Sequence, residues 1–282
     1  MDVVAVGIED TEESRDALRF ARQLADREEA ELHVVSVHTD TVFYEGREQI
    51  EAVRESYFAR MVEFAREEIG EPFSFHEITE VSAPRGLTEL AEKVNAGILV
   101  IGSSHRGPIG RALLGDAGAR LTSGAPCAVA VTPRGWADAS PDRIGKIGIG
   151  FEATPDAEAA LTYGSELAGK LHASVLVLGV IPARVHRGRG GFSDLAYWNL
   201  LREDMEEDLA EAVKRVNVDD VETEVRAGLP VDELTRESND LDLLVLGSRS
   251  YGPVRRVLLG GTSVPVMRSS ACPVVVVPRA AQ

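Results

Sequence analysis

The sequence predicts an α/β protein of two tandem domains, each an open, Rossmann-like parallel sheet, related by internal duplication. Short apolar runs such as Val3–Ile8 alternate with longer amphipathic segments such as Ser14–Arg27 along the whole chain. Continuous apolar runs are typical of strands buried on both faces, which requires helices on both sides of a parallel sheet. The length of 282 residues suits two such domains better than one.

An internal repeat supports the duplication. Residues 102–134 and 247–279 are identical at 13 of 33 positions with a constant separation of 145 residues (247 − 102). Glu9 and Thr11 recur as Glu152 and Thr154, 143 residues later (152 − 9). A repeat this long indicates tandem globular domains rather than a solenoid. We therefore expect domains at 1–138 and 143–282, with a linker near 135–143, which is rich in turn-forming residues.

The elements follow from the period of the apolar residues, which is continuous in buried strands and about 3.6 in helices. Either Thr11 or Ser14 can cap the first helix, and Val53 falls on the apolar face of the second. The first unit is expected to hold strands at Val3–Ile8, Glu31–Val37, Phe73–Val81, Ile98–Ile101 and Cys127–Val131, and helices at Ser14–Arg27, Phe43–Ile69 and Leu87–Val94. The second unit is expected to hold strands at Lys146–Gly150, Ser174–Ile181, Val221–Val225, Leu243–Leu246 and Pro273–Val277, and helices at Asp156–Lys170, Ser193–Val216 and Val231–Glu237.

Composition limits the partners and the compartment. The net charge of −16 argues against nucleic acid or an anionic membrane surface as a general partner. Only two cysteines are present, which favours a reducing compartment. We expect no signal peptide and no membrane span, because no apolar run approaches the roughly 20 residues that a span requires. These observations together predict a cytoplasmic protein.

Two glycine-rich loops are the candidate functional elements. Gly247–Ser263 follows the apolar run Leu241–Leu246, and Gly102–Gly118 follows Gly97–Ile101. A loop that leads from a buried strand into a helix presents free backbone N–H groups, which bind phosphate well. Ligands of such sheets bind at the carboxyl ends of the strands, so the first and fourth strand ends should meet there. The loop at Glu152–Thr154 is therefore expected to face the second glycine-rich loop.

On these loops and this strand order, the whole chain resembles the universal stress protein family, in a tandem form with the adenine nucleotide alpha hydrolase-like fold. Members of that family bind ATP through a pattern of glycine, two residues, glycine, nine residues, glycine, and then serine or threonine. Their first strand usually ends in an aspartate that contacts the nucleoside. The resemblance implies ATP with Mg²⁺ as cofactor and a regulatory role in stress response. It also implies that the last strands pair the two halves as an intramolecular pseudo-dimer, and that whole chains can form a homodimer.

Carried onto this sequence, the family pattern favours a site in the second domain. Ser250 replaces the middle glycine, Gly261 replaces the hydroxyl residue, and Glu152 replaces the aspartate. In the first domain, Asp116 stands at the hydroxyl position, where a carboxylate opposes a phosphate by about 1 kcal/mol or more. The expected nucleotide contacts are Glu152, Thr154, Val180, Gly247, Arg249, Gly260, Gly261, Thr262 and Ser263. A weaker second site is expected at Glu9, Thr11, Val37, Gly102 and Gly115.

Other interpretations stay open at this point. The substitutions in both loops are also consistent with a nucleotide-free tandem scaffold that acts by binding a protein partner. A weak ATPase would need a positioned base and a metal, and the sequence identifies no catalytic residue and no metal-ligand spacing. Cys127 and Cys272 occupy equivalent places, so back-to-back packing of the halves would allow the two thiols to approach each other.

Overall fold

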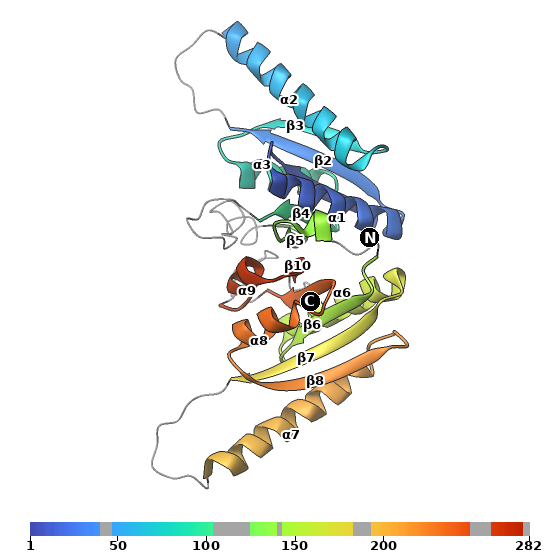
Figure 1. Cartoon of the computed structure of the whole chain (residues 1–282), viewed down its shortest axis with the longest axis vertical. Helices are drawn as coiled ribbons and strands as arrows, with labels where there is room; N and C mark the ends of the chain where they lie inside the picture. Colours follow the sequence, from blue (N-terminus) through green and yellow to red (C-terminus); the bar gives the residue numbers. More distant parts are fainter. Residues whose placement is uncertain (40–46, 104–124, 140–142, 183–192, 249–260, 279–282) are drawn as a thin grey trace.

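The computed structural model describes residues 1–39, 47–103, 125–139, 143–182, 193–248 and 261–278. Within this part of the chain, one ten-stranded sheet runs in the order β3-β2-β1-β4-β5-β10-β9-β6-β7-β8 (Figure 1). Each half of the chain contributes five consecutive strands of that sheet. The predicted α/β class, the duplication and the neighbouring positions of the first and fourth strands are confirmed.

The strand bounds agree with the sequence prediction to within two residues at most ends. The first half contains β1 (Val3–Ile8), β2 (Glu31–His38), β3 (Ser74–Thr79), β4 (Ile98–Gly102) and β5 (Ala128–Thr132). The second half contains β6 (Lys146–Phe151), β7 (Ser174–Pro182), β8 (Val221–Gly228), β9 (Leu243–Gly247) and β10 (Val274–Val277). The central strands are buried almost throughout, as expected for a sheet covered on both faces.

Helices cover both faces of the sheet. One face carries α1 (Glu12–Glu28), α2 (Arg47–Ile69), α6 (Pro155–Leu171) and α7 (Ser193–Val213), which share a single apolar cluster. The other face carries α3 (Ala83–Lys93), α8 (Pro230–Glu237) and α9 (Ser263–Ser269). Thr11, rather than Ser14, is the N-cap of α1, and Thr154 caps α6 in the same way. Helix α3 begins four residues before the predicted start, because Ser82 takes the N-cap position and Pro84 is tolerated in the first turn.

The two halves are joined by their last strands. Strands β5 and β10 pair antiparallel, with Val131 opposite Val274 and Val129 opposite Val276, whereas the other strand pairs are parallel. The predicted pairing within one chain is therefore confirmed, and it covers two strand edges that would otherwise expose unpaired backbone groups.

Of the two alternatives for the cysteines, an approach of the thiols or two separate buried residues, the structure has the second. In the antiparallel register, Cys127 lies level with the end of β10, whereas Cys272 lies just before its start. Cys127 is thus level with a position six residues after Cys272, a distance of about 20 Å along the strand. Both cysteines are free and buried, and burial raises the pKa of each thiol to about 12.

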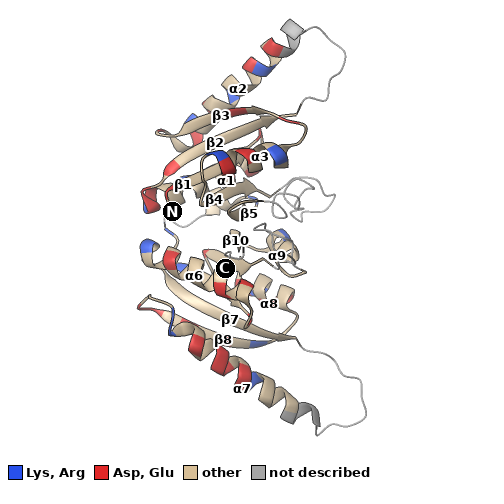
Figure 2. Cartoon of the chain, turned by 180° about the vertical axis from the view of Figure 1, so that it is seen from behind, with Lys and Arg blue, Asp and Glu red and all other residues tan. Residues whose placement is uncertain are grey.

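Helices α2 and α7 extend beyond the sheet at opposite ends of the molecule (Figure 1). Val53 of α2 is 64% exposed, so its predicted place on the packed face is wrong: only the later turns, at Phe58, Met61 and Ala65, are buried. In α7 the buried residues Leu209 and Ala212 likewise lie near the C-terminal end of the helix. The middle of α7 is rich in acidic residues (Figure 2): Glu203, Asp204, Glu206, Glu207 and Asp208.

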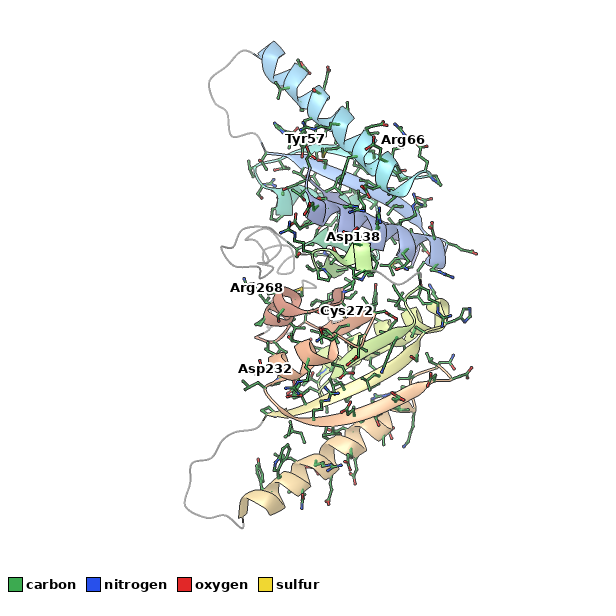
Figure 3. The ribbon with its side chains drawn as sticks, viewed as in Figure 1. Tyr57, Arg66, Asp138, Asp232, Arg268 and Cys272 are labelled. Carbon is green, nitrogen blue, oxygen red and sulfur yellow. The ribbon has the colours of Figure 1, made fainter. Side chains whose placement is uncertain are left out.

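The expected linker is partly helical and packed, which corrects the prediction of a turn-rich connection. Helix α5 (Trp136–Ala139) lies against α1, where Trp136 meets Phe20 edge to face at 5.3 Å between ring centroids. The buried carboxylate of Asp16 accepts hydrogen bonds from the backbone N–H groups of Gly135 and Ala137, at 2.8 and 2.7 Å. Asp138 pairs with Arg15 on the same side of α1 (Figure 3).

Candidate functional site

A cleft opens in the second half at the carboxyl ends of β6, β7 and β9. It encloses about 800 Å³, part of which is open to solvent. Its walls are formed by Gly150, Phe151, Glu152, Thr154, Asp156, Ala157, Leu178, Val180, Pro182, Pro230, Leu234, Leu246, Gly247, Thr262 and Ser263.

Most of the predicted site residues in the second half come together at this cleft. The structure places Glu152, Thr154, Val180, Gly247, Thr262 and Ser263 around it. Gly261 is exposed beside Thr262 and does not line the cleft. Arg249 and Gly260 lie outside the described residues, as do Gly115 of the first half and the segment 183–192.

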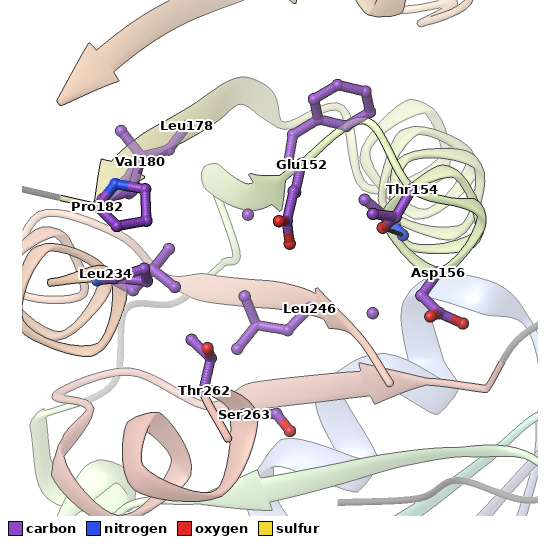
Figure 4. Close-up of a pocket in the computed structure, with 15 residues that line it drawn as sticks. Glu152, Thr154, Asp156, Leu178, Val180, Pro182, Leu234, Leu246, Thr262 and Ser263 are labelled. Carbon is purple, nitrogen blue, oxygen red and sulfur yellow. Dashed lines mark hydrogen bonds between the residues drawn. The ribbon is translucent and has the colours of Figure 1, made fainter. Parts of the chain in front are cut away.

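The cleft has an apolar end and a polar end (Figure 4). Val180 and Pro182 at the end of β7 lie near Leu234 of α8, and together they form the apolar end. Asp156 and Ser263 belong to the polar end, and the Glu152 side chain points into the space between the two ends. Such a site can hold a ligand that has a flat apolar group joined to a polar group.

Two buried hydroxyl groups near the carboxyl end of β9 have no hydrogen-bond partner among the residues that the structure describes. Ser263, which lines the cleft, is 3% exposed, and Ser248, directly after Gly247, is fully buried. A buried hydroxyl group without a partner costs about 1–3 kcal/mol, so such groups in native proteins usually mark a missing water or ligand. Ser263 lines the cleft, and a ligand there would satisfy its hydroxyl group.

Gly247 is constrained by packing as well as by its place in the cleft. A Cβ atom at this position would overlap the backbone carbonyl group of Asp156, at the start of α6. Gly102 lies equally close to the backbone of Glu13 in α1. The close approach of strand end and helix start therefore requires glycine here, whether or not a ligand binds.

The corresponding region of the first half differs in two ways. Ser14 stands where the second half has Ala157, and its Oγ accepts a hydrogen bond from the Glu9 backbone N–H at 2.8 Å. Val37, the counterpart of Val180, is 8% exposed and packs beneath Gly86 of α3. The predicted residues Glu9, Thr11 and Gly102 keep the same places in the fold, but Val37 offers a ligand little free surface.

Sequence reasoning missed nine lining residues: Gly150, Phe151, Asp156, Ala157, Leu178, Pro182, Pro230, Leu234 and Leu246. Most of them lie near the carboxyl ends of strands or at the start of the helix that follows, so the strand-end rule could have identified them. Among the residues that the structure describes, no group of three or more metal-binding side chains is found, and no helix is long and apolar enough to cross a membrane.

Comparison with known proteins identifies relatives along the whole chain. The universal stress protein family model matches residues 1–133 and 143–278. Universal stress protein Rv2319c of Mycobacterium tuberculosis is 28% identical over 213 residues, covering 73% of this chain and 72% of that protein. The crystal structure of a universal stress protein from Archaeoglobus fulgidus superposes with a TM-score of 0.66 at 19% identity, over 99% of this chain and 98% of the other. The crystal structure of a protein from Pseudomonas aeruginosa superposes with a TM-score of 0.68 at 18% identity, over 99% of this chain and 94% of the other.

Proposed function

The chain belongs to the universal stress protein family, and on that premise we propose that its second half binds an adenine nucleotide, with ATP and Mg²⁺ as the expected form. The protein would use this site in a regulatory role during stress response in the cytoplasm. The proposed domains are residues 1–138 and 143–282, with one nucleotide bound per chain. Homodimerisation of the whole chain is part of the same proposal, and light scattering tests it.

The observation that carries the proposal is the unpartnered hydroxyl group of Ser263 at the polar end of a cleft whose other end is apolar. The nucleobase would lie against Val180 and Pro182, and the phosphates would lie at Thr262 and Ser263. The carboxylates of Glu152 and Asp156 offer oxygen ligands of the kind that Mg²⁺ prefers. The bound nucleotide would thus satisfy a hydroxyl group that has no partner within the described part of the chain.

Isothermal titration with ATP and Mg²⁺ tests the proposal, with Ser263→Ala as the variant. Removing an unpartnered hydroxyl group should leave the melting temperature of the nucleotide-free protein unchanged or slightly raised. The same change should weaken ATP binding about 10- to 100-fold, because a hydrogen bond to a charged group contributes about 1.5–3 kcal/mol.

Ser103→Ala is the matched control. Ser103 is also buried, and its Oγ also has no partner among the described residues, but it lies after β4 in the first half. Its replacement should leave ATP affinity at the wild-type value. Wild-type protein that does not bind millimolar ATP with Mg²⁺, or Ser263→Ala protein that binds ATP as the wild type does, would contradict the proposed site.

One observation favours a second candidate function, a nucleotide-free scaffold that binds a protein partner. The Glu152 side chain points into the cleft, where the family aspartate would be one methylene shorter (Figure 4). If Glu152 fills the sugar position, freshly purified protein should release no nucleotide on heat denaturation, and Glu152→Asp should create ATP binding. Nucleotide recovered from the wild-type protein would reject the scaffold alternative.

A further inference from the structure

The first half of α7 forms a surface that the rest of the described chain does not cover. The helix extends past β8, and Tyr197 and Leu200 on this part are 61% and 53% exposed. Large apolar side chains gathered on an uncovered helix face are typical of binding surfaces. Leu209 and Ala212, about two and a half to four turns later, are buried, so the helix itself is anchored.

Acidic residues continue this apolar stripe along the same exposed face. Asp204 and Asp208 follow Tyr197 and Leu200 at helical spacing, and Glu203 and Glu207 lie beside them. All four carboxylates are exposed, and none of them has an ion-pair partner among the described residues. Ion pairs of this region that the structure describes join Arg202 to Glu206, Lys214 to Glu211 and Arg215 to Glu158.

This arrangement weakens the helix in the free protein. Glu203 and Glu207 are four residues apart, as are Asp204 and Asp208, and like charges at this spacing repel each other on a helix. The corresponding helix of the first half, α2, also has glutamates four residues apart, at Glu51 and Glu55, but it places arginines among them. There Arg54 pairs with Glu51, and Arg66 pairs with Glu63. In α7, by contrast, four neighbouring exposed carboxylates share one stretch of helix, and none of them has an ion-pair partner within the described residues.

We propose that this α7 face, defined by Tyr197, Leu200, Glu203, Asp204, Glu207 and Asp208, is a docking surface for a protein partner that presents an amphipathic helix rich in lysine and arginine. The two apolar side chains would fill the apolar stripe of the partner. The four carboxylates would pair with its cations, which would also remove the repulsion within α7. The net charge of −16 attracts any cation weakly, so the apolar residues must supply the specificity.

The experiment uses the full chain and a fluorescein-labelled helical peptide of leucine and lysine as the probe, followed by fluorescence anisotropy. The double variant Tyr197→Ala/Leu200→Ala should weaken peptide binding at least tenfold, and Asp204→Asn/Asp208→Asn should weaken it and reduce its salt dependence. Val53→Ala on α2, equally exposed and apolar, is the matched control and should bind the peptide as the wild type does. The melting temperature should be unchanged in the apolar variants and slightly raised in the Asn variant.

Three results would overturn the proposal. The first is no binding of the leucine–lysine peptide by the wild-type chain. The second is equal binding by the Tyr197→Ala/Leu200→Ala variant, which would reduce the effect to general attraction by an acidic protein. The third is a dimer in light scattering that this double variant dissociates, which would assign the face to a second copy of the chain. None of these results bears on ATP binding, so this proposal and the nucleotide proposal can fail separately.

Discussion

Replacement of Gly247 by alanine tests why the glycine-rich loop begins with glycine. The added Cβ would overlap backbone atoms of Asp156 and would touch the backbone nitrogen of Ala157. Backbone atoms at the start of a 17-residue helix cannot move aside as a flexible side chain can. Overpacking costs about 1–3 kcal/mol, and we expect the upper end of this range here.

A loss of about 3 kcal/mol corresponds to a drop in melting temperature of roughly 6–12 °C for a domain of this size. Thermal unfolding followed by circular dichroism measures it, and Gly261→Ala is the matched control. Because no atom lies within 4 Å of a Cβ at Gly261, this control should melt within about 2 °C of the wild type. A Gly247→Ala protein as stable as the Gly261→Ala control would show that the strand end and the helix can separate cheaply, and the packing argument would fail.

Three further predictions concern the linker, the sheet edge and the cleft. Asp16→Ala should destabilise the protein by about 2–3 kcal/mol in urea unfolding, because two backbone N–H groups of the linker lose their charged acceptor, and Asp16→Asn should recover part of the loss. Burial, with smaller contributions from His33 and Lys93, lowers the pKa of His76, so its stabilising contribution is full above about pH 6.5 and is lost as the pH falls below that value. Melting temperatures between pH 7.5 and 5 should therefore fall less steeply in His76→Gln than in the wild type, and parallel curves would contradict this. Gly261→Ser restores the family hydroxyl group in open space and should tighten ATP binding up to about tenfold in calorimetry, whereas weaker binding would show that the hydroxyl group is misplaced.

The fold could be predicted because its signals are local and repeated. The run Val3–Ile8 is apolar throughout, its counterpart Lys146–Phe151 is apolar after its first residue, and each is followed by a threonine that caps a helix. The internal repeat, with separations of 143 to 145 residues along the chain, then predicted the tandem arrangement. The linker helix could not be predicted because it depends on a distant residue. The Asp16 carboxylate accepts a hydrogen bond from the backbone N–H of Gly135, 119 residues later in the chain. Contacts over such separations leave no periodic signal.

The cleft was predicted in part, for a similar reason. Glu152, Thr154 and Ser263 follow strand ends or open helices, so the topology rule alone brought them together. Pro230 and Leu234 were missed because their part in the cleft depends on how α8 packs over the sheet. Val53 was placed wrongly because helical period shows which residues share a face, but not where the sheet beneath that face ends. Cys127 and Cys272 stay apart because equivalent positions in an antiparallel pair lie at opposite ends.

Photolabelling with an azido derivative of ATP tests the central claim most directly, since it locates the nucleotide on the chain. After digestion, mass spectrometry should find the label on the peptide that contains Val180 and Pro182, or on the one that contains Pro230 and Leu234. An excess of unmodified ATP should remove the label. Labelling that excess ATP does not remove, or labelling confined to the peptide around Val37 in the first half, would contradict the account.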